Sequence, residues 1–157
     1  MQHPHDTDRV IAPRLAQWYV RVTTMIWGVF GVGIGIAILV GGDERWSGIS
    51  YEVAASTPGA PASWGIAILL AGVLILIGAI SGRPRYTALG GLIGTSWGVL
   101  FAISFIVASI RYPAANNTAF WAYAAIATMF ALSGAVSLVM DPPPRLRKLY
   151  RRFDRKA

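Results

Sequence analysis

The chain has 157 residues, of which 55% are hydrophobic and 13% are charged, whereas a typical soluble domain has about 25% charged residues. Its mean hydropathy of +0.53 is typical of an integral membrane protein. The net charge of +7 does not indicate nucleic acid as a partner, because the basic residues lie outside the apolar segments. The sequence has no cysteine, which excludes disulfides, thiolate metal sites and cysteine nucleophiles.

The first predicted element is a helix over residues 13–40, preceded by a polar tail, residues 1–12, that we expect to be disordered. Pro13 suits the first turn of a helix, where its missing N–H is not needed. Residues 22–40 contain no ionisable side chain. At 1.5 Å per residue they span about 28 Å, close to the hydrocarbon thickness of a bilayer.

A polar segment over residues 41–63 is expected to be the one long outer loop. We expect Ser50 to cap a short helix in this loop and Ser63 to cap the following span. Its aromatic residues are typical of the headgroup region of a bilayer. Alternatively, a loop longer than the connection requires can serve as a recognition surface. The candidate recognition residues are Trp46, Tyr51, Glu52 and Trp64.

Three further spans are predicted over residues 64–81, 87–110 and 118–140. The basic Arg-Pro-Arg turn at residues 83–85 is short, so the spans on either side of it must form an antiparallel hairpin. The span over residues 87–110 is about 36 Å long as a helix and should cross the membrane with some tilt.

Glycines four residues apart leave one face of a helix without side chains, so that another helix can approach its backbone. The span over residues 87–110 has three such glycines, and we expect the other spans to be arranged around it. Its partner can be the first or second span of this chain or a helix of another copy. The candidate packing residues are Gly31, Gly35, Gly78, Gly82, Gly90, Gly94 and Gly98.

The distribution of basic residues predicts the topology. Twelve of the fourteen Lys and Arg residues lie in residues 1–21, in the turn at residues 83–85 and in residues 141–157, and two lie in the other connections. The positive-inside rule then puts both termini in the cytoplasm. The predicted fold is therefore an all-α integral membrane protein, an antiparallel bundle of four transmembrane helices, in a bacterial inner membrane.

The C-terminal segment, residues 141–157, begins with Asp-Pro-Pro-Pro and continues as a basic segment with apolar residues at helical spacing. This pattern is typical of an amphipathic helix on an anionic membrane surface. The residues expected to contact anionic lipid are Arg145, Arg147, Lys148, Arg151, Arg152 and Arg155.

Residues 94–98 match the Gly-x-Ser-x-Gly pattern of serine hydrolases, but both histidines of the chain lie in the N-terminal tail, far from Ser96. Proton-coupled transport normally needs an ionisable side chain within the membrane. Apart from tyrosine, no such side chain lies in the predicted spans over residues 22–40, 64–81, 87–110 and 118–140. We therefore predict no catalytic, cofactor-binding or metal site, and not an enzyme.

Two stretches carry a resemblance: Arg-Trp-Ser-Gly at residues 45–48, and Pro-Gly-Ala-Pro-Ala-Ser-Trp-Gly at residues 58–65 with the Gly- and Leu-rich span that follows. Over roughly residues 15–140 the chain resembles small four-span membrane proteins of actinobacteria and their phages. Some of these are called holins. The resemblance implies the fold and topology, and it assigns no functional residue.

Two functions fit these features. The first is a non-enzymatic, self-associating membrane protein of phage or prophage type, holin-like or envelope-modifying, in which the small-residue faces join copies into a homo-oligomer. The alternative is an accessory or superinfection-exclusion protein that binds an envelope protein through residues 41–63. Both include a bilayer with anionic lipids as a partner, and neither includes nucleic acid.

Overall fold

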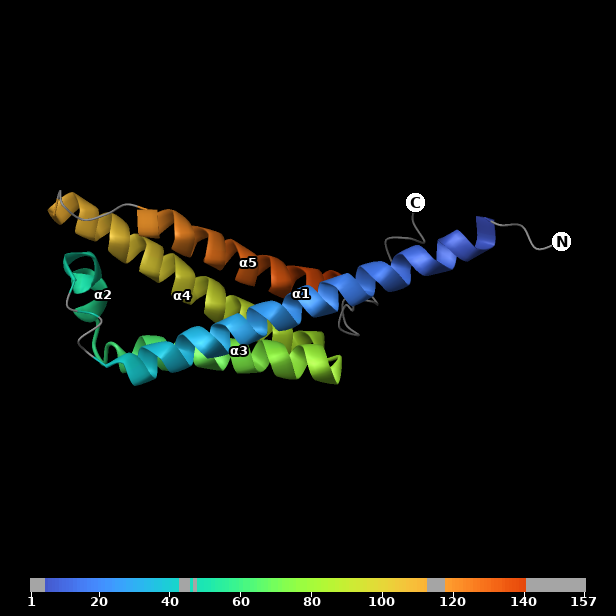
Figure 1. The fold of residues 1–157 in the computed structure, drawn as a ribbon, viewed down its shortest axis with the longest axis horizontal. Helices are drawn as coiled ribbons and strands as arrows, with labels where there is room; N and C mark the ends of the chain where they lie inside the picture. The colour runs from blue at the N-terminus through green and yellow to red at the C-terminus, as the bar shows by residue number, and fades with distance from the viewer. Residues whose placement is uncertain (1–4, 43–45, 47, 113–117, 141–157) are drawn as a thin grey trace, which may run out of the picture.

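The computed structural model describes residues 5–42, 46, 48–112 and 118–140, with side chains from Leu15 onward. Over these residues the chain is helical and contains no strand (Figure 1). The C-terminal segment, with all six residues expected to contact anionic lipid, lies outside the described residues. The elements are α1 (His5–Gly41), η2 (Ile49–Tyr51), α2 (Glu52–Ala55), α3 (Ala62–Ser81), α4 (Pro84–Arg111) and α5 (Thr118–Met140).

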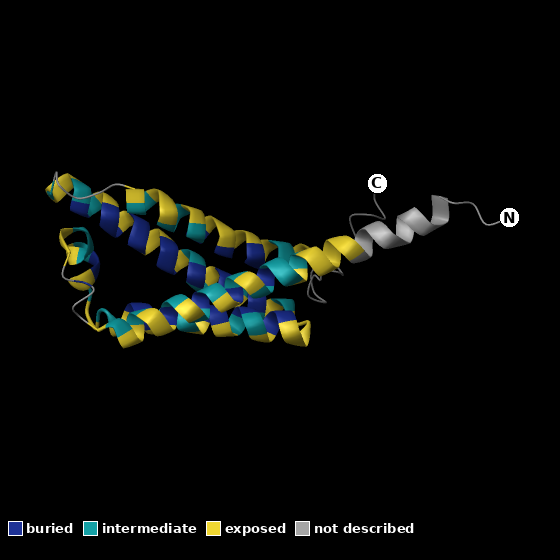
Figure 2. Ribbon diagram, in the orientation of Figure 1, coloured by how far each residue is buried: buried dark blue, intermediate teal, exposed yellow. Residues whose placement is uncertain are grey.

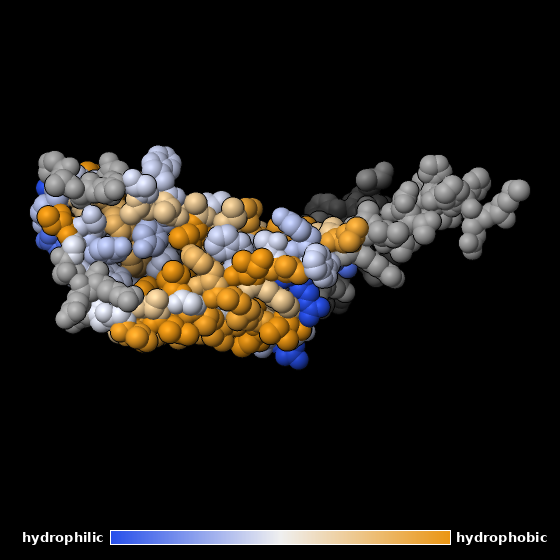
Figure 3. Space-filling view, in the orientation of Figure 1, coloured by the Kyte–Doolittle hydropathy of each residue, from blue (hydrophilic) through white to orange (hydrophobic). Residues whose placement is uncertain are grey.

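Four of these helices are long and apolar enough to cross a membrane: Leu15–Gly41 within α1, and the whole of α3, α4 and α5. They pack against one another, so the prediction of an all-α, four-span bundle is confirmed and the chain is a multi-pass membrane protein. Exposed apolar side chains cover the face formed by α1 and α3, while hydrophilic side chains gather where α3 turns into α4 (Figure 3).

Consecutive long helices run antiparallel (Figure 1). Helix α1 packs on α3, α3 on α4, and α4 on α5, and a smaller contact between α1 and α5 closes the bundle. Helix α4 contacts α3, α5 and both short helices, which is the central position expected of the third span. We call the end that carries Arg21, Arg83 and Arg85 the basic end, and the end that carries η2 and α2 the lid end.

Buried residues line the facing sides of the helices, and many of them are glycines (Figure 2). A Cβ atom on Gly90 would lie 2.6 Å from the carbonyl oxygen of Ala71 in α3. The equivalent atom on Gly94 would lie 2.5 Å from the ring of Phe130, and on Gly98 2.9 Å from the Cβ of Ala127. Helix α4 therefore uses its glycines against α3 and α5, whereas the expected partners within the chain were α1 and α3.

Of the four remaining candidate glycines, three pack against another helix and one does not. Gly31 approaches Gly72, Gly35 approaches Leu69, and Gly78 approaches Thr87 across the bundle. Gly82 does not pack: no atom lies within 4 Å of its ideal Cβ position. With φ of 65° it is the left-handed residue that ends α3, a conformation that glycine adopts without steric cost.

Three predicted helix starts are wrong. Helix α1 begins at His5, so the expectation of disorder up to residue 12 is wrong from His5 onward. Pro13 lies inside the helix, where it removes one backbone hydrogen bond without ending the helix. Neither Ser50 nor Ser63 caps a helix with its side chain. Backbone carbonyls accept hydrogen bonds from N–H groups at these helix starts instead. The N–H of Tyr51 donates to the carbonyl of Gly48 at 2.8 Å, and the N–H of Ser63 donates to the carbonyl of Gly59 at 2.9 Å.

Candidate functional site

The connection between α1 and α3 folds inward over α4. We call Trp46 and residues 48–61 the aromatic lid. The side chain of Trp46 is 9% exposed and that of Trp64, at the start of α3, is 8% exposed. Both rings are therefore packed inside the bundle and not exposed at its surface, because α4 offers them an aromatic surface on which they bury apolar area. Their depth in the membrane stays a prediction.

Phe101 of α4 is the centre of this aromatic surface. Its ring centroid lies 4.6 Å from Trp64, 4.7 Å from Trp97, 4.8 Å from Tyr123 and 5.5 Å from Trp46. Such pairs contribute about 0.5–1.5 kcal/mol each beyond their buried area. The aromatic lid therefore contacts α4 through Phe101, whose ring also contacts rings of α3 and α5.

Two buried indole N–H groups connect the aromatic lid to α3, and α3 to α4. The Nε1–H of Trp64 donates to the carbonyl of Ala54 in α2 at 3.0 Å, and the Nε1–H of Trp97 donates to the carbonyl of Trp64 at 3.1 Å. Ala54 itself is fully buried. Since a buried N–H without a partner is costly, the lid has to stay docked for the Trp64–Ala54 bond to form, while the Trp97–Trp64 bond holds α3 against α4.

A polar contact closes the rim of the lid. The hydroxyl of Tyr112, which follows α4, donates to the carboxylate of Glu52 at 2.7 Å. This hydrogen bond raises the pKa of Tyr112 above its ordinary value, with desolvation adding to the effect. Both side chains lie outside the membrane-spanning segments.

The Tyr112–Glu52 contact predicts a pH dependence of stability. Because the pKa of Tyr112 is raised, the contribution of the bond is complete below about pH 10 and is lost as the pH rises through the raised value. We expect Tyr112→Phe to be less stable than the parent at pH 7, and this deficit to be smaller at pH 12. Unfolding by SDS at the two pH values measures this difference. Tyr19→Phe is the control, because Tyr19 is exposed and lies at the basic end of the bundle. If the loss of stability in Tyr112→Phe is as large at pH 12 as at pH 7, the prediction is wrong.

The four candidate recognition residues thus differ in position. Trp46 and Trp64 are buried, Tyr51 is partly buried against Phe105, and only Glu52 is exposed. The exposed lid surface also includes Ile49, of which 52% is accessible. Recognition by the lid stays a prediction, but the aromatic side chains serve to fix its shape.

Comparison with protein-family models, with curated proteins and with solved structures finds no match to this chain.

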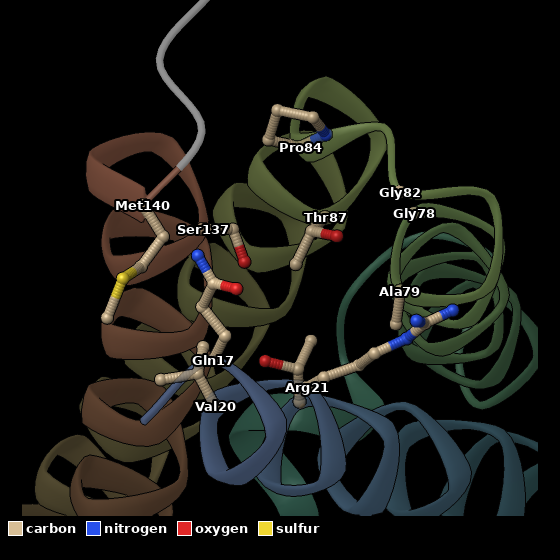
Figure 4. A pocket seen from close by; sticks show the side chains of 11 residues that line it. Gln17, Val20, Arg21, Gly78, Ala79, Gly82, Pro84, Thr87, Ser137 and Met140 are labelled. Atoms are coloured by element: carbon tan, nitrogen blue, oxygen red, sulfur yellow. The ribbon is translucent and has the colours of Figure 1, made fainter. Parts of the chain in front are cut away.

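A second candidate site lies at the basic end, where the four long helices enclose a pocket of about 270 Å³ (Figure 4). Arg21 reaches across it from α1, and one guanidinium N–H donates to the carbonyl of Ile80 in α3 at 3.1 Å. Its other polar lining residues are Gln17, Thr24, Thr87 and Ser137. These residues could not be predicted as a site from the sequence, because isolated polar residues in separate spans show no spacing that brings them together.

The chemistry available at either end is limited. Among the described residues, no three His, Asp or Glu side chains lie close enough together to hold a metal ion. Ser96 is exposed on α4, away from the aromatic cluster and the pocket lining. The two ends therefore offer a preformed surface at one side and a pocket of hydrogen-bond donors at the other.

Proposed function

We propose that the protein is a non-enzymatic interaction protein of the bacterial cytoplasmic membrane, which presents the aromatic lid to a protein of the cell envelope. The proposal rests mainly on the anchoring of the lid by Trp64, whose indole N–H bonds to Ala54 of α2 and whose carbonyl accepts a bond from Trp97 of α4. A loop held in one conformation loses little entropy on binding, which favours recognition over a passive connection.

The distribution of arginines supports an orientation for this proposal. Arg21, Arg83 and Arg85 lie at the basic end, and the seven basic residues after Met140 follow from the same end in sequence. By the positive-inside rule this end faces the cytoplasm, together with both termini. The aromatic lid is then outside, where it can meet an envelope protein.

Photo-crosslinking in cells tests the proposed function. A photoreactive residue at Ile49, on the exposed lid surface, is expected to give a discrete protein adduct. The same residue at Leu92, which is 64% exposed on the lipid-facing side of α4, is the control and should give none. An adduct at Ile49 should disappear when Trp64→Leu removes an anchor of the lid. If Ile49 gives no protein adduct, the lid is not a recognition surface.

Self-association of holin type is the second candidate, and a face of α1 favours it. Gly33 is exposed with no atom within 4 Å of its ideal Cβ position, and Ala37 one turn later is also exposed. This small-residue face is available to a second copy, whereas most of the predicted packing glycines contact helices of their own chain. If the protein self-associates in this way, its expression should depolarise the host membrane, which a potential-sensitive dye measures. Gly33→Leu should then abolish the depolarisation.

A further inference from the structure

We propose that the pocket at the basic end binds the phosphate headgroup of one anionic phospholipid. The pocket is formed by residues from α1, α3, α4 and α5, so it exists only in the assembled bundle (Figure 4). Its volume of about 270 Å³ can hold a phosphate group with its glycerol linkage. The C-terminal basic segment is a separate feature, and it lies outside the described residues.

Of the three hydroxyls in the pocket lining, that of Ser137 donates to the carbonyl of Ser133 at 2.8 Å, and the other two are not used. Thr24 is 4% exposed and Thr87 is 2% exposed, yet neither hydroxyl has a hydrogen-bond partner among the described residues. Neither hydroxyl oxygen is completely enclosed, and both residues line the pocket. A nearly buried hydroxyl normally has a partner, which indicates that an occupant supplies the acceptor.

Arg21 gives the occupant its charge. Only one of its guanidinium N–H groups is bonded, to Ile80, and the others have no partner among the described residues. None of the described residues that line the pocket is acidic, and Arg83 and Arg85 lie at the same end of the bundle. Arginine N–H groups and hydroxyls together match a phosphate, whose oxygens only accept hydrogen bonds.

The surroundings favour a lipid over a soluble anion. Trp18 and Tyr19, on α1 beside the pocket residues Gln17 and Arg21, are about two-thirds exposed, which is typical of aromatic residues at a membrane interface. The exposed side chains of Ile80 and Met140 provide an apolar surface at the same level. A phospholipid can place its headgroup in the pocket and its acyl chains along these residues, and basic pockets between membrane helices are known to bind such headgroups.

Native mass spectrometry of the full chain, released from micelles containing phosphatidylglycerol or phosphatidylcholine with the same acyl chains, tests the proposal. We expect one phosphatidylglycerol to be retained at low lipid concentration, and phosphatidylcholine to be retained about tenfold less, as expected when charge complementarity is lost. Arg21→Gln and the double variant Thr24→Val/Thr87→Val should each reduce phosphatidylglycerol retention about tenfold. The double variant keeps the Arg21–Ile80 bond, so it remains informative if Arg21→Gln does not fold.

Two controls isolate the pocket. Arg85→Gln removes a cation at the same end that does not line the pocket, and Thr128→Val removes an exposed hydroxyl on α5 that bonds to Ala124. Both should retain phosphatidylglycerol within about twofold of the parent. The basic C-terminal segment is present in every variant, so its contribution cancels. Retention that is unchanged in the pocket variants would overturn the site, and displacement of the lipid by equimolar inorganic phosphate would overturn the lipid as its occupant.

Discussion

Replacing Gly72 with leucine is expected to lower the free energy of unfolding by about 3 kcal/mol, at the upper end of the usual cost of overpacking. A Cβ atom at this position would lie 2.5 Å from the backbone nitrogen of Val32 and 2.6 Å from the carbonyl oxygen of Gly28. Both are backbone atoms of α1, which cannot move aside as a flexible side chain can. The substitution therefore forces α1 away from α3.

Gly33→Leu is the matched control for this prediction. It adds the same side chain to the same pair of packed helices, but no atom lies within 4 Å of the ideal Cβ position of Gly33. Replacing glycine within a helix also adds up to about 1 kcal/mol of helix propensity. SDS unfolding should therefore find Gly33→Leu at least as stable as the parent and Gly72→Leu much less stable. Equal effects of the two substitutions would mean that α1 and α3 are not in backbone contact at Gly72.

Phe101→Ala is expected to cost about 3–5 kcal/mol, the range found when a buried aromatic side chain is truncated. Phe101 is 1% exposed and its ring contacts the rings of Trp46, Trp64, Trp97 and Tyr123. Truncation removes the surface on which the aromatic lid packs. We therefore expect the lid to open as well as the bundle to weaken, with tryptophan fluorescence shifting to longer wavelength before global unfolding.

Leu100→Ala provides the comparison. Leu100 precedes Phe101 in α4 but is 51% exposed on the lipid-facing side, so its truncation leaves no cavity in the bundle. Unfolding measured by SDS titration should differ from the parent by less than about 1 kcal/mol for this variant. If Phe101→Ala costs no more than Leu100→Ala, or leaves the tryptophan emission unchanged, the aromatic cluster does not hold the lid.

The bounds of the spans could be predicted from sequence because bilayer thickness determines how many apolar residues a helix needs. Helix α5 begins and ends at the predicted residues, and α3 and α4 differ by three residues or fewer at each end. The start of α1 could not be predicted in this way. Its first residues lie before the apolar segment, where the hydrocarbon core imposes no pattern.

The side-chain arrangement was harder to predict. Tryptophan in a polar loop has the same sequence context whether its ring lies among headgroups or inside the bundle, so the burial of Trp46 could not be anticipated. In helices that are apolar on all sides the buried face has no compositional signal. Glycine spacing identified α4 as a packing helix, but its contacts with Phe130 and Ala127 depend on the position of α5. The pocket at the basic end likewise depends on four separate helices.

The central claim is that the aromatic lid and the basic turn lie on opposite sides of a membrane, with the turn in the cytoplasm. Because the chain has no cysteine, a single cysteine can be placed at Ser56 in the lid or at Arg85 in the turn, both exposed positions. A membrane-impermeant maleimide should label Ser56→Cys in intact cells and Arg85→Cys only after the membrane is permeabilised. Labelling of Arg85→Cys in intact cells, with Ser56→Cys protected or labelled alongside it, would contradict the account.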